Sequence, residues 1–172
     1  MHMNNQMNDR MLYFSSLLRR QPDARAILEG SPSYASIRGR VAFYQTPFGV
    51  LAATEVYGLP SNEQPCASRI FALHIHEGSS CTGNAEDPFA DAMTHYNPNN
   101  CDHPFHAGDM PPLFDANGYS FSAFLSNRFT VKEIIGRTVI LHAGIDDFTS
   151  QPAGNAGKKI ACGKIMRLSR NL

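Results

Sequence analysis

The stretch YASIRGRVAFYQTPFGVLAATEVYG, residues 34–58, holds two runs of alternating residues separated by a short turn sequence. In the first run Ile37, Val41 and Phe43 fall on one face, and two arginines fall on the other. Because the side chains of a β-strand point alternately to its two faces, each run predicts a strand, the first from residue 34 to residue 44. The residues TPFG between the runs predict a turn. The stretch therefore predicts a β-hairpin and an all-β fold class.

Shorter runs with the same two-residue period occur along the rest of the chain, separated by turns rich in Gly, Pro, Asn and Asp. Many short strands with no long helical pattern predict a β-sandwich or barrel. Two segments break the strand pattern, residues 77–117 and 143–157, and are predicted to be long functional loops. The other predicted strands are 24–29, 69–76, a strand with Phe121, Ala123 and Leu125 on one side, 138–142 and 159–166.

The length of 172 residues fits one domain with a single core. We predict that this domain spans residues 24–172 and that residues 1–23 form an N-terminal arm, either a short helix or disordered. Lys+Arg and Asp+Glu are both 15, so the formal net charge is zero, which argues against a nucleic-acid partner. No apolar stretch approaches the ~20 residues that cross a bilayer, so no membrane association is expected.

The sequence leaves the cellular compartment open. The apolar run at residues 11–18 is short, is followed by two arginines and has no small-residue cleavage pattern, so it favours a cytoplasmic protein. An even number of cysteines allows disulfides, which favours the periplasm, the cell surface or the extracellular medium. No two cysteines form a CxxC pair, which argues against a cysteine zinc knuckle or a thioredoxin-type motif. The four cysteines are Cys66, Cys81, Cys101 and Cys162.

Six of the seven histidines gather at the ends of two predicted strands and in one predicted loop. His74 and His76 are two residues apart on a strand, so their rings project from the same face. Histidines combined with a carboxylate, as in HPFHAGD at residues 103–109, suit zinc. A set of four imidazoles suits copper. The six histidines are His74, His76, His95, His103, His106 and His142.

Five separated motifs resemble, in order, those of the copper/zinc superoxide dismutase family, and they cover roughly residues 24–168. The resemblance implies an eight-stranded antiparallel Greek-key β-sandwich or barrel, immunoglobulin-like in architecture. The close spacing of His103 and His106 resembles a compressed, bacterial-type zinc loop rather than that of animal members. The motifs are LHIHE at 73–77, HYNP at 95–98, HAGD at 106–109, GRTVILH at 136–142 and GNAGKKIACG at 154–163.

The resemblance implies a paired site for copper and zinc, with His95 as the bridge. Asp146 resembles the family's carboxylate that holds a copper ligand and a zinc ligand in place. Cys81 and Cys162 resemble the family's intrasubunit disulfide. The implied copper ligands are His74, His76, His95 and His142, and the implied zinc ligands are His95, His103, His106 and Asp109.

The activity that the resemblance implies is dismutation of the superoxide anion to dioxygen and hydrogen peroxide by copper that cycles between two oxidation states. His95 is implied to leave the reduced copper, to take up a proton and later to supply it. Zinc is implied to hold the loop and to tune His95 without redox work.

Two features depart from the family pattern. Where the family usually has an arginine that binds superoxide, this chain has Lys159, which keeps the charge but lacks the planar fork. We therefore predict activity at a reduced rate; the alternative is that Lys159 is a solvated surface lysine. Residues 148–157 carry no charge. Charges that steer an anion raise association rates by ~10–10³, so their absence also predicts a slower enzyme.

Some alternatives stay open at this level. The main rival is a non-enzymatic copper- and zinc-binding protein that stores or delivers metal on the same scaffold. A zinc-only structural domain is a weaker rival, because zinc alone does not need His74, His76 and His142. A homodimer is one option for the oligomeric state. Cys66 and Cys101 are either free thiols or a pair.

Overall fold

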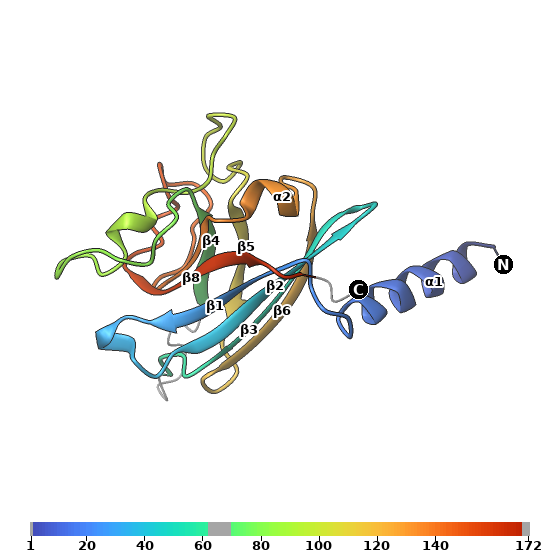
Figure 1. Ribbon diagram of the computed structural model, residues 1–172, viewed down its shortest axis with the longest axis horizontal. Helices are drawn as coiled ribbons and strands as arrows, with labels where there is room; N and C mark the ends of the chain where they lie inside the picture. Colours follow the sequence, from blue (N-terminus) through green and yellow to red (C-terminus); the bar gives the residue numbers. More distant parts are fainter. Residues whose placement is uncertain (1, 62–69, 170–172) are drawn as a thin grey trace.

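The computed structural model describes residues 2–61 and 70–169, with side chains from residue 9 onward (Figure 1). Within these ranges, eight antiparallel strands form a nearly closed barrel, in the order β5-β4-β7-β8-β1-β2-β3-β6. This confirms the predicted all-β, Greek-key fold class. The strands are β1 (Ala24–Gly30), β2 (Arg38–Thr46), β3 (Gly49–Tyr57), β4 (Ile70–His76), β5 (Asp109–Phe114), β6 (Tyr119–Ser126), β7 (Thr138–His142) and β8 (Lys159–Arg167). The helices are α1 (His2–Leu17) and α2 (Val131–Ile134), with 3-10 turns η1 (Pro32–Tyr34) and η2 (Ala90–Ala92).

Strands β2 and β3 form the predicted hairpin. Their register pairs Thr46 with Gly49 and so leaves a two-residue turn, and Gly49 has a φ of 127°, which favours glycine. Alternate residues of both strands enter the main core, as the sequence pattern predicts. These core residues are Val41, Phe43, Val50, Ala52 and Val56, with Ile37 just before β2.

Two predicted boundaries are wrong. β2 begins at Arg38 rather than at residue 34, because residues 32–34 form the turn η1. The segment 77–117, predicted to be irregular, contains strand β5. Pro111 and Pro112 hide this strand in the sequence, because proline has no N–H for a sheet ladder. They are tolerated because β5 lies at the end of the strand order, with a hydrogen-bonded neighbour on one side only.

Strand β6 places Phe121, Ala123 and Leu125 on one face, as predicted, and that face points outward. Phe121 and Leu125 are accordingly exposed. Helix α2, which was not predicted, follows β6. Its sequence signal is a capping box, in which Thr130 and Glu133 each bond the other's backbone N–H.

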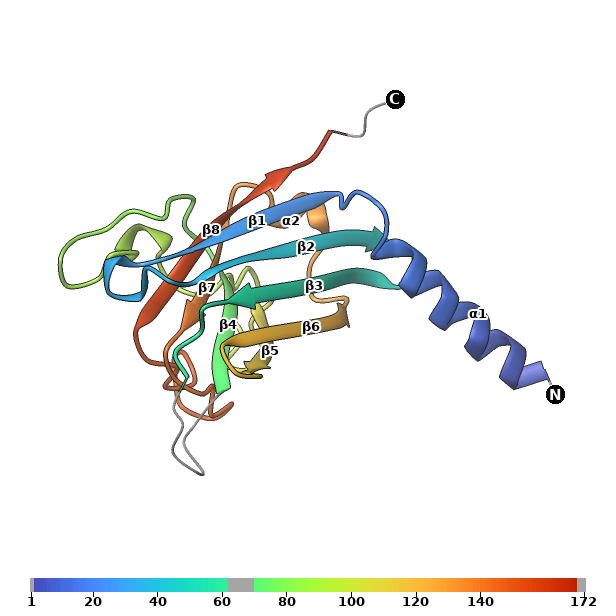
Figure 2. The same cartoon turned by 90° about the horizontal axis from the view of Figure 1, so that it is seen from below.

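Helix α1 projects from the barrel at the end opposite the long loops (Figure 2). Near its C-terminal end, Leu17 is buried against Ala42 and Leu51 on the outer face of β2 and β3. The helix therefore covers a part of the hairpin that would otherwise face water. The division of the chain at residue 24 stays a prediction.

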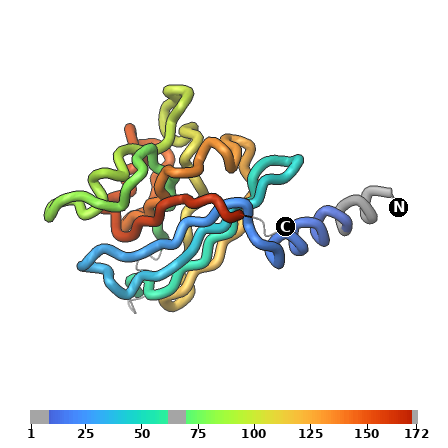
Figure 3. The backbone as a smooth tube through the Cα atoms, viewed as in Figure 1, coloured from blue at the N-terminus to red at the C-terminus, as the bar shows by residue number. Residues whose placement is uncertain are grey.

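Two long loops, residues 77–108 and 143–158, lie on the same side of the barrel (Figure 3). A disulfide between Cys81 and Cys162 joins the first loop to β8 and confirms that predicted pair. The first loop is also tied to the second, because the Gln151 side chain donates to the carbonyl of residue 103 at 2.7 Å. These two connected loops cover the site described below.

Two further predictions concern the remaining cysteines and the membrane. Cys101 is a free thiol. Cys66 lies outside the described residues, as does residue 69 of the predicted strand 69–76. Among the described residues, no helix is both long enough and apolar enough to span a bilayer.

Candidate metal centre

The strand part of the site comes from β4 and its neighbour β7. Leu73 and Ile75 enter the main core, so His74 and His76 project from the opposite face of β4, beneath the loops. β7 pairs with β4 and ends at His142. All three histidines are buried.

Backbone hydrogen bonds bring the loop part of the site against β4. The Tyr96 N–H donates to the Ile75 carbonyl, and the Ile75 N–H donates to the Gly108 carbonyl, both at 2.8 Å. His76 and His95 also form a single β-bridge. His95 is therefore placed between the strand histidines and the turn that begins at residue 103.

The structure thus brings the predicted residues together in two groups that share His95. In each group the potential ligand atoms all lie within 4.8 Å of one another, and every residue is buried. The four-histidine set consists of His74, His76, His95 and His142, and the mixed set consists of His95, His103, His106 and Asp109.

In the four-histidine set, two ring nitrogens face each other with their lone pairs exposed. The Nδ1 atoms of His76 and His142 lie 2.9 Å and 3.1 Å from the carbonyls of Met93 and Gly157. A carbonyl only accepts, so each Nδ1 carries the hydrogen and each Nε2 has a free lone pair. The two Nε2 atoms are 3.2 Å apart. Two lone pairs at this distance repel unless a cation lies beside both, which is the condition that a bound metal satisfies.

Asp146 connects the two sets. Its Oδ2 lies 2.8 Å from His74 Nε2, and its Oδ1 lies 2.8 Å from His103 Nε2. These bonds fix the hydrogen of each ring on Nε2 and leave Nδ1 as the ligand atom. Among the described residues, His74 Nδ1 has no hydrogen-bond partner, and His103 Nδ1 faces only another acceptor, Asp109 Oδ2. Buried polar atoms without partners are rare, and these lone pairs fit a bound cation.

In the mixed set, the Asp109 carboxylate lies among the three histidines. Its Oδ1 is 2.8 Å from His95 Nδ1, and its Oδ2 is 3.1 Å from His103 Nδ1. His106 Nδ1 is 3.4 Å from His95 Nδ1. His95 therefore offers Nδ1 to the mixed set, while its buried Nε2 has no partner among the described residues.

The electrostatics hold these groups in the protonation states that bind metal. Burial lowers the pKa of His142 from 6.5 to about 3 and places the pKa of His76 well below 6.5. Burial alone would raise the pKa of Asp146, but bonds from His74, the Phe148 N–H and His103 hold it well below its usual range. Neutral imidazoles and ionised carboxylates are the forms that coordinate metals.

One glycine leaves room for the bond between the two loops. Gly154 has a φ of 61°, and a Cβ at this position would fall against Asp146 Oδ1 and His103 Nε2. The GNAG motif at residues 154–157 therefore has a steric reason: a side chain at its first position would separate Asp146 from His103.

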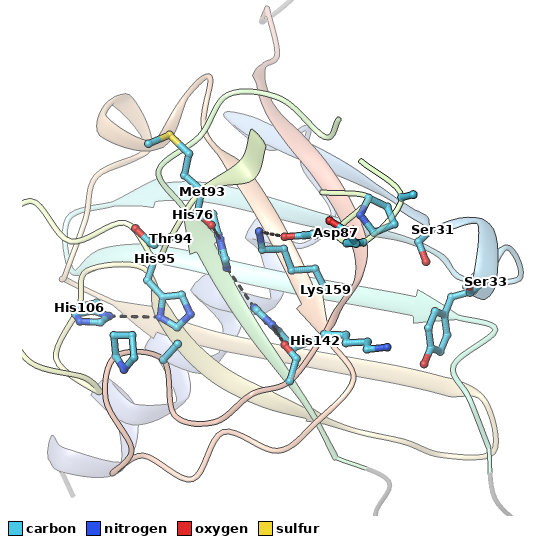
Figure 4. Close-up of a pocket in the computed structure, with 18 of the residues that line it drawn as sticks. Ser31, Ser33, His76, Asp87, Met93, Thr94, His95, His106, His142 and Lys159 are labelled. Atoms are coloured by element: carbon cyan, nitrogen blue, oxygen red, sulfur yellow. Dashed lines mark hydrogen bonds and ion pairs between the residues drawn. The ribbon is translucent and has the colours of Figure 1, made fainter. Parts of the chain in front are cut away.

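A cavity of about 960 Å³ opens beside the two sets (Figure 4). His76, His95 and His142 line it, as does Lys159. Lys159 is no solvated surface lysine, because its Nζ donates to Asp87 Oδ2 at 2.8 Å and to the Phe89 carbonyl at 3.0 Å. Asp87 was not predicted from the sequence, since it lies 72 residues before its partner and in no motif.

Comparisons with known proteins agree with this geometry. Residues 37–165 match the family model described as copper/zinc superoxide dismutase (SODC). The chain is 32% identical over 158 residues to Cu-Zn superoxide dismutase 2 of Aquifex aeolicus, covering 83% of this chain and 87% of that one. It is 29% identical over 162 residues to the Cu-Zn superoxide dismutase of Legionella pneumophila, covering 90% and 93%.

A solved structure, the Cu/Zn superoxide dismutase from Brucella abortus, has the same fold, with a TM-score of 0.66 at 22% identity. The alignment covers 82% of this chain and 98% of that chain. The family match spans most of the barrel and both loops, and it includes every residue of the two metal-binding sets. This chain belongs to the copper/zinc superoxide dismutase family.

Proposed function

We propose that this protein catalyses the dismutation of superoxide, with copper in the four-histidine set and zinc in the mixed set. The observation that carries the proposal is the position of His95, which offers one ring nitrogen to each set. A single imidazole that serves two sets would link the metals that the two sets hold.

The donor atoms fit these two metals. Four imidazole nitrogens suit copper. Three histidines and a carboxylate suit a closed, four-coordinate zinc site. Copper, when bound, supplies the one-electron oxidation and reduction that the reaction needs, and zinc supplies none. Asp146 holds a ligand of each set in the correct ring orientation, as outer hydrogen-bond partners of metal ligands do.

The reaction also needs protons for the product and positive charge near the anion, and residues of the protein can supply both. Two superoxide anions and two protons give one dioxygen and one hydrogen peroxide. His95 Nε2, which faces the four-histidine set, is the atom where the protein can hold a proton and pass it to the peroxide product. Lys159, on the cavity wall, provides positive charge close to the approach of the anion.

The rate is proposed to be lower than is usual in the family. A lysine ammonium keeps the charge of an arginine but lacks the planar fork that orients a small anion. The uncharged segment 148–157 adds no steering charge beside the cavity. Steering of this kind changes association rates by ~10–10³.

The disulfide bears on the compartment. Disulfides persist in oxidising surroundings, so the bond between Cys81 and Cys162 fits a periplasmic or extracellular location. The cytoplasmic location expected from residues 11–18 has not been confirmed. A homodimer also stays a prediction.

The test is the rate of superoxide decay after pulse radiolysis, measured on protein loaded with copper and zinc and analysed for metal content. The proposal predicts a rate proportional to bound copper and absent from protein loaded with zinc alone. Full copper loading without dismutation would overturn it and would leave a copper-binding protein on a dismutase scaffold.

A further inference from the structure

An ion pair lies on the wall of the cavity. Lys159 is the first residue of β8 and pairs in register with His142, so it lies beside the four-histidine set. Its ammonium does not extend freely into the cavity but bonds to Asp87 and to the Phe89 carbonyl on the loop opposite (Figure 4). Only 15% of the Lys159 side chain is exposed, against 39% for Asp87.

The loop presents the Asp87 carboxylate in a fixed position. Oδ1 accepts from the Phe89 N–H at 3.0 Å, which leaves Oδ2 for Lys159. The Asp87 N–H in turn donates to Asn84 Oδ1 at 2.9 Å. The same loop is tied by the disulfide of Cys81 to Cys162, three residues beyond Lys159 on β8. The Asp87 carboxylate and the Lys159 ammonium therefore belong to two segments that a disulfide joins.

The pair leaves the cavity wall without excess positive charge. The Lys and Arg residues that line the cavity are Lys158 and Lys159, and the Asp and Glu residues are Glu86 and Asp87. Burial alone would raise the pKa of Asp87, but the bonds from Lys159 and from the Phe89 N–H lower it, so the carboxylate is ionised at neutral pH. An approaching anion therefore meets two opposite charges in contact.

We propose that Asp87 is a positioning residue that holds the Lys159 ammonium on the cavity wall and neutralises it, so that a small anion must compete with this carboxylate. The inference rests on the proposed function and names the residue that limits anion access to that same site. It predicts that the cation beside the metal centre attracts anions only weakly.

The sign of the effect follows from the charges. Replacing Asp87 by asparagine keeps an oxygen for the Phe89 N–H and removes one negative charge next to the ammonium. One unit charge at ~4 Å across water changes anion affinity by about fivefold. Asp87→Asn is therefore expected to bind anions more tightly and to react with superoxide faster. Both gains should shrink as salt screens the freed charge.

The experiment measures azide affinity by the absorption change of the copper- and zinc-loaded protein. Asp87→Asn should raise the affinity about fivefold, and Glu86→Gln, which removes the same charge from the neighbouring residue, by less than about twofold. In a Lys159→Gln background, Asp87→Asn should raise azide affinity by less than about twofold, as Glu86→Gln does, because no ammonium remains to be freed. Equal azide affinities of wild type and Asp87→Asn, or an equal gain in Glu86→Gln, would overturn the inference.

A second measurement separates this inference from the proposed function. In zinc-loaded protein, NMR correlation spectra of lysine NH₃⁺ groups should show a Lys159 signal in the wild type that disappears in Asp87→Asn. If the loaded wild type fails to dismutate superoxide but the azide and NMR results hold, the proposed function fails and the role of Asp87 stands. A Lys159 signal absent from wild type, or unchanged in Asp87→Asn, would show that the ion pair does not exist in solution.

Discussion

The two metal-binding sets are built differently, although they share His95. Three members of the four-histidine set lie on strands β4 and β7, whose positions the barrel core fixes. All members of the mixed set lie between residues 95 and 109, in a loop and at the first residue of β5. A core of packed side chains can prepare the first set without metal, whereas the second depends on loop hydrogen bonds and on the carboxylate of Asp109. The four-histidine set should therefore keep its geometry after loss of zinc better than the mixed set keeps its geometry after loss of copper.

Low pH should reduce the stability of the metal-free protein, mainly through the four-histidine set. Burial lowers the folded-state pKa of His74, His76 and His142 below 6.5, so below that pH the unfolded chain binds more protons than the folded metal-free protein. Stability is unaffected above pH 6.5 and falls below it. Because the slope reaches about 1.4 kcal/mol per pH unit only well below pH 6.5, the loss between about pH 6.5 and pH 5.5 is up to about 1 kcal/mol for each group, or about 3 kcal/mol for the three.

Urea unfolding of the metal-free protein at both pH values measures this loss. His142→Gln should reduce the pH dependence by about a quarter, since burial also lowers the pKa of His106 and the variant removes one of four such groups. A free energy of unfolding that stays constant across this range would show that these histidines are not buried as neutral groups.

Asp146→Ala should damage both sets together, because the carboxylate bonds His74 and His103. Two buried N–H donors would lose their acceptor, at a cost of about 3 kcal/mol in the free energy of unfolding. Loss of an outer partner of metal ligands should also weaken binding of each metal by ~10–100-fold. Thermal unfolding and competition with chelators measure the two effects.

The matched control is Asp147→Asn, at an exposed carboxylate that bonds only its own turn at Thr149 and Ser150. It should leave the thermal stability and the affinity for both metals close to those of the wild type. An Asp146→Ala variant that binds copper normally and loses zinc alone would contradict the role given to this residue as the link between the sets.

Asp109→Asn should weaken zinc binding and leave copper binding nearly unchanged. The substitution removes the charged oxygen ligand of the mixed set and should lower zinc affinity by about 100-fold or more. Copper affinity should change by less than about threefold, because the strands and the carbonyls of Met93 and Gly157 hold His76 and His142 independently. Chelator competition monitored for each metal gives both values, and a parallel loss of copper and zinc would refute the proposed independence.

The smallest effect is expected at the cavity wall. Lys159→Arg restores a planar fork but still faces Asp87, so we expect the superoxide rate constant to rise by only about threefold. Pulse radiolysis at matched copper content measures it. Equal rates for the two proteins would show that the fork has no role here.

Part of this account could be predicted from the sequence. The alternation in residues 37–56 predicts the hairpin because a strand buries one face, and the same period gives His74 and His76 a common face. The disulfide pair and the positions of the histidines in two groups followed from motif resemblance. Strand β5 was missed because Pro111 and Pro112 oppose strand formation locally, and only its place at the end of the sheet permits it.

Contacts between distant segments could not be predicted. Asp87 meets Lys159 only because the disulfide and the packing of Phe89 against Ile140 and Cys162 fold the loop over β8. Likewise, the burial of Leu17 on the hairpin depends on where the chain enters the barrel. Neither contact has a local sequence signal, since each depends on tertiary packing.

The central claim is that His95 joins a copper site to a zinc site. Crystals of the loaded protein, with anomalous diffraction recorded at the copper and zinc absorption edges, test it most directly. The account predicts copper within the four-histidine set, zinc within the mixed set, and His95 as a ligand of both. Zinc in both positions, copper bound away from His74, His76 and His142, or a His95 that contacts neither metal would contradict it.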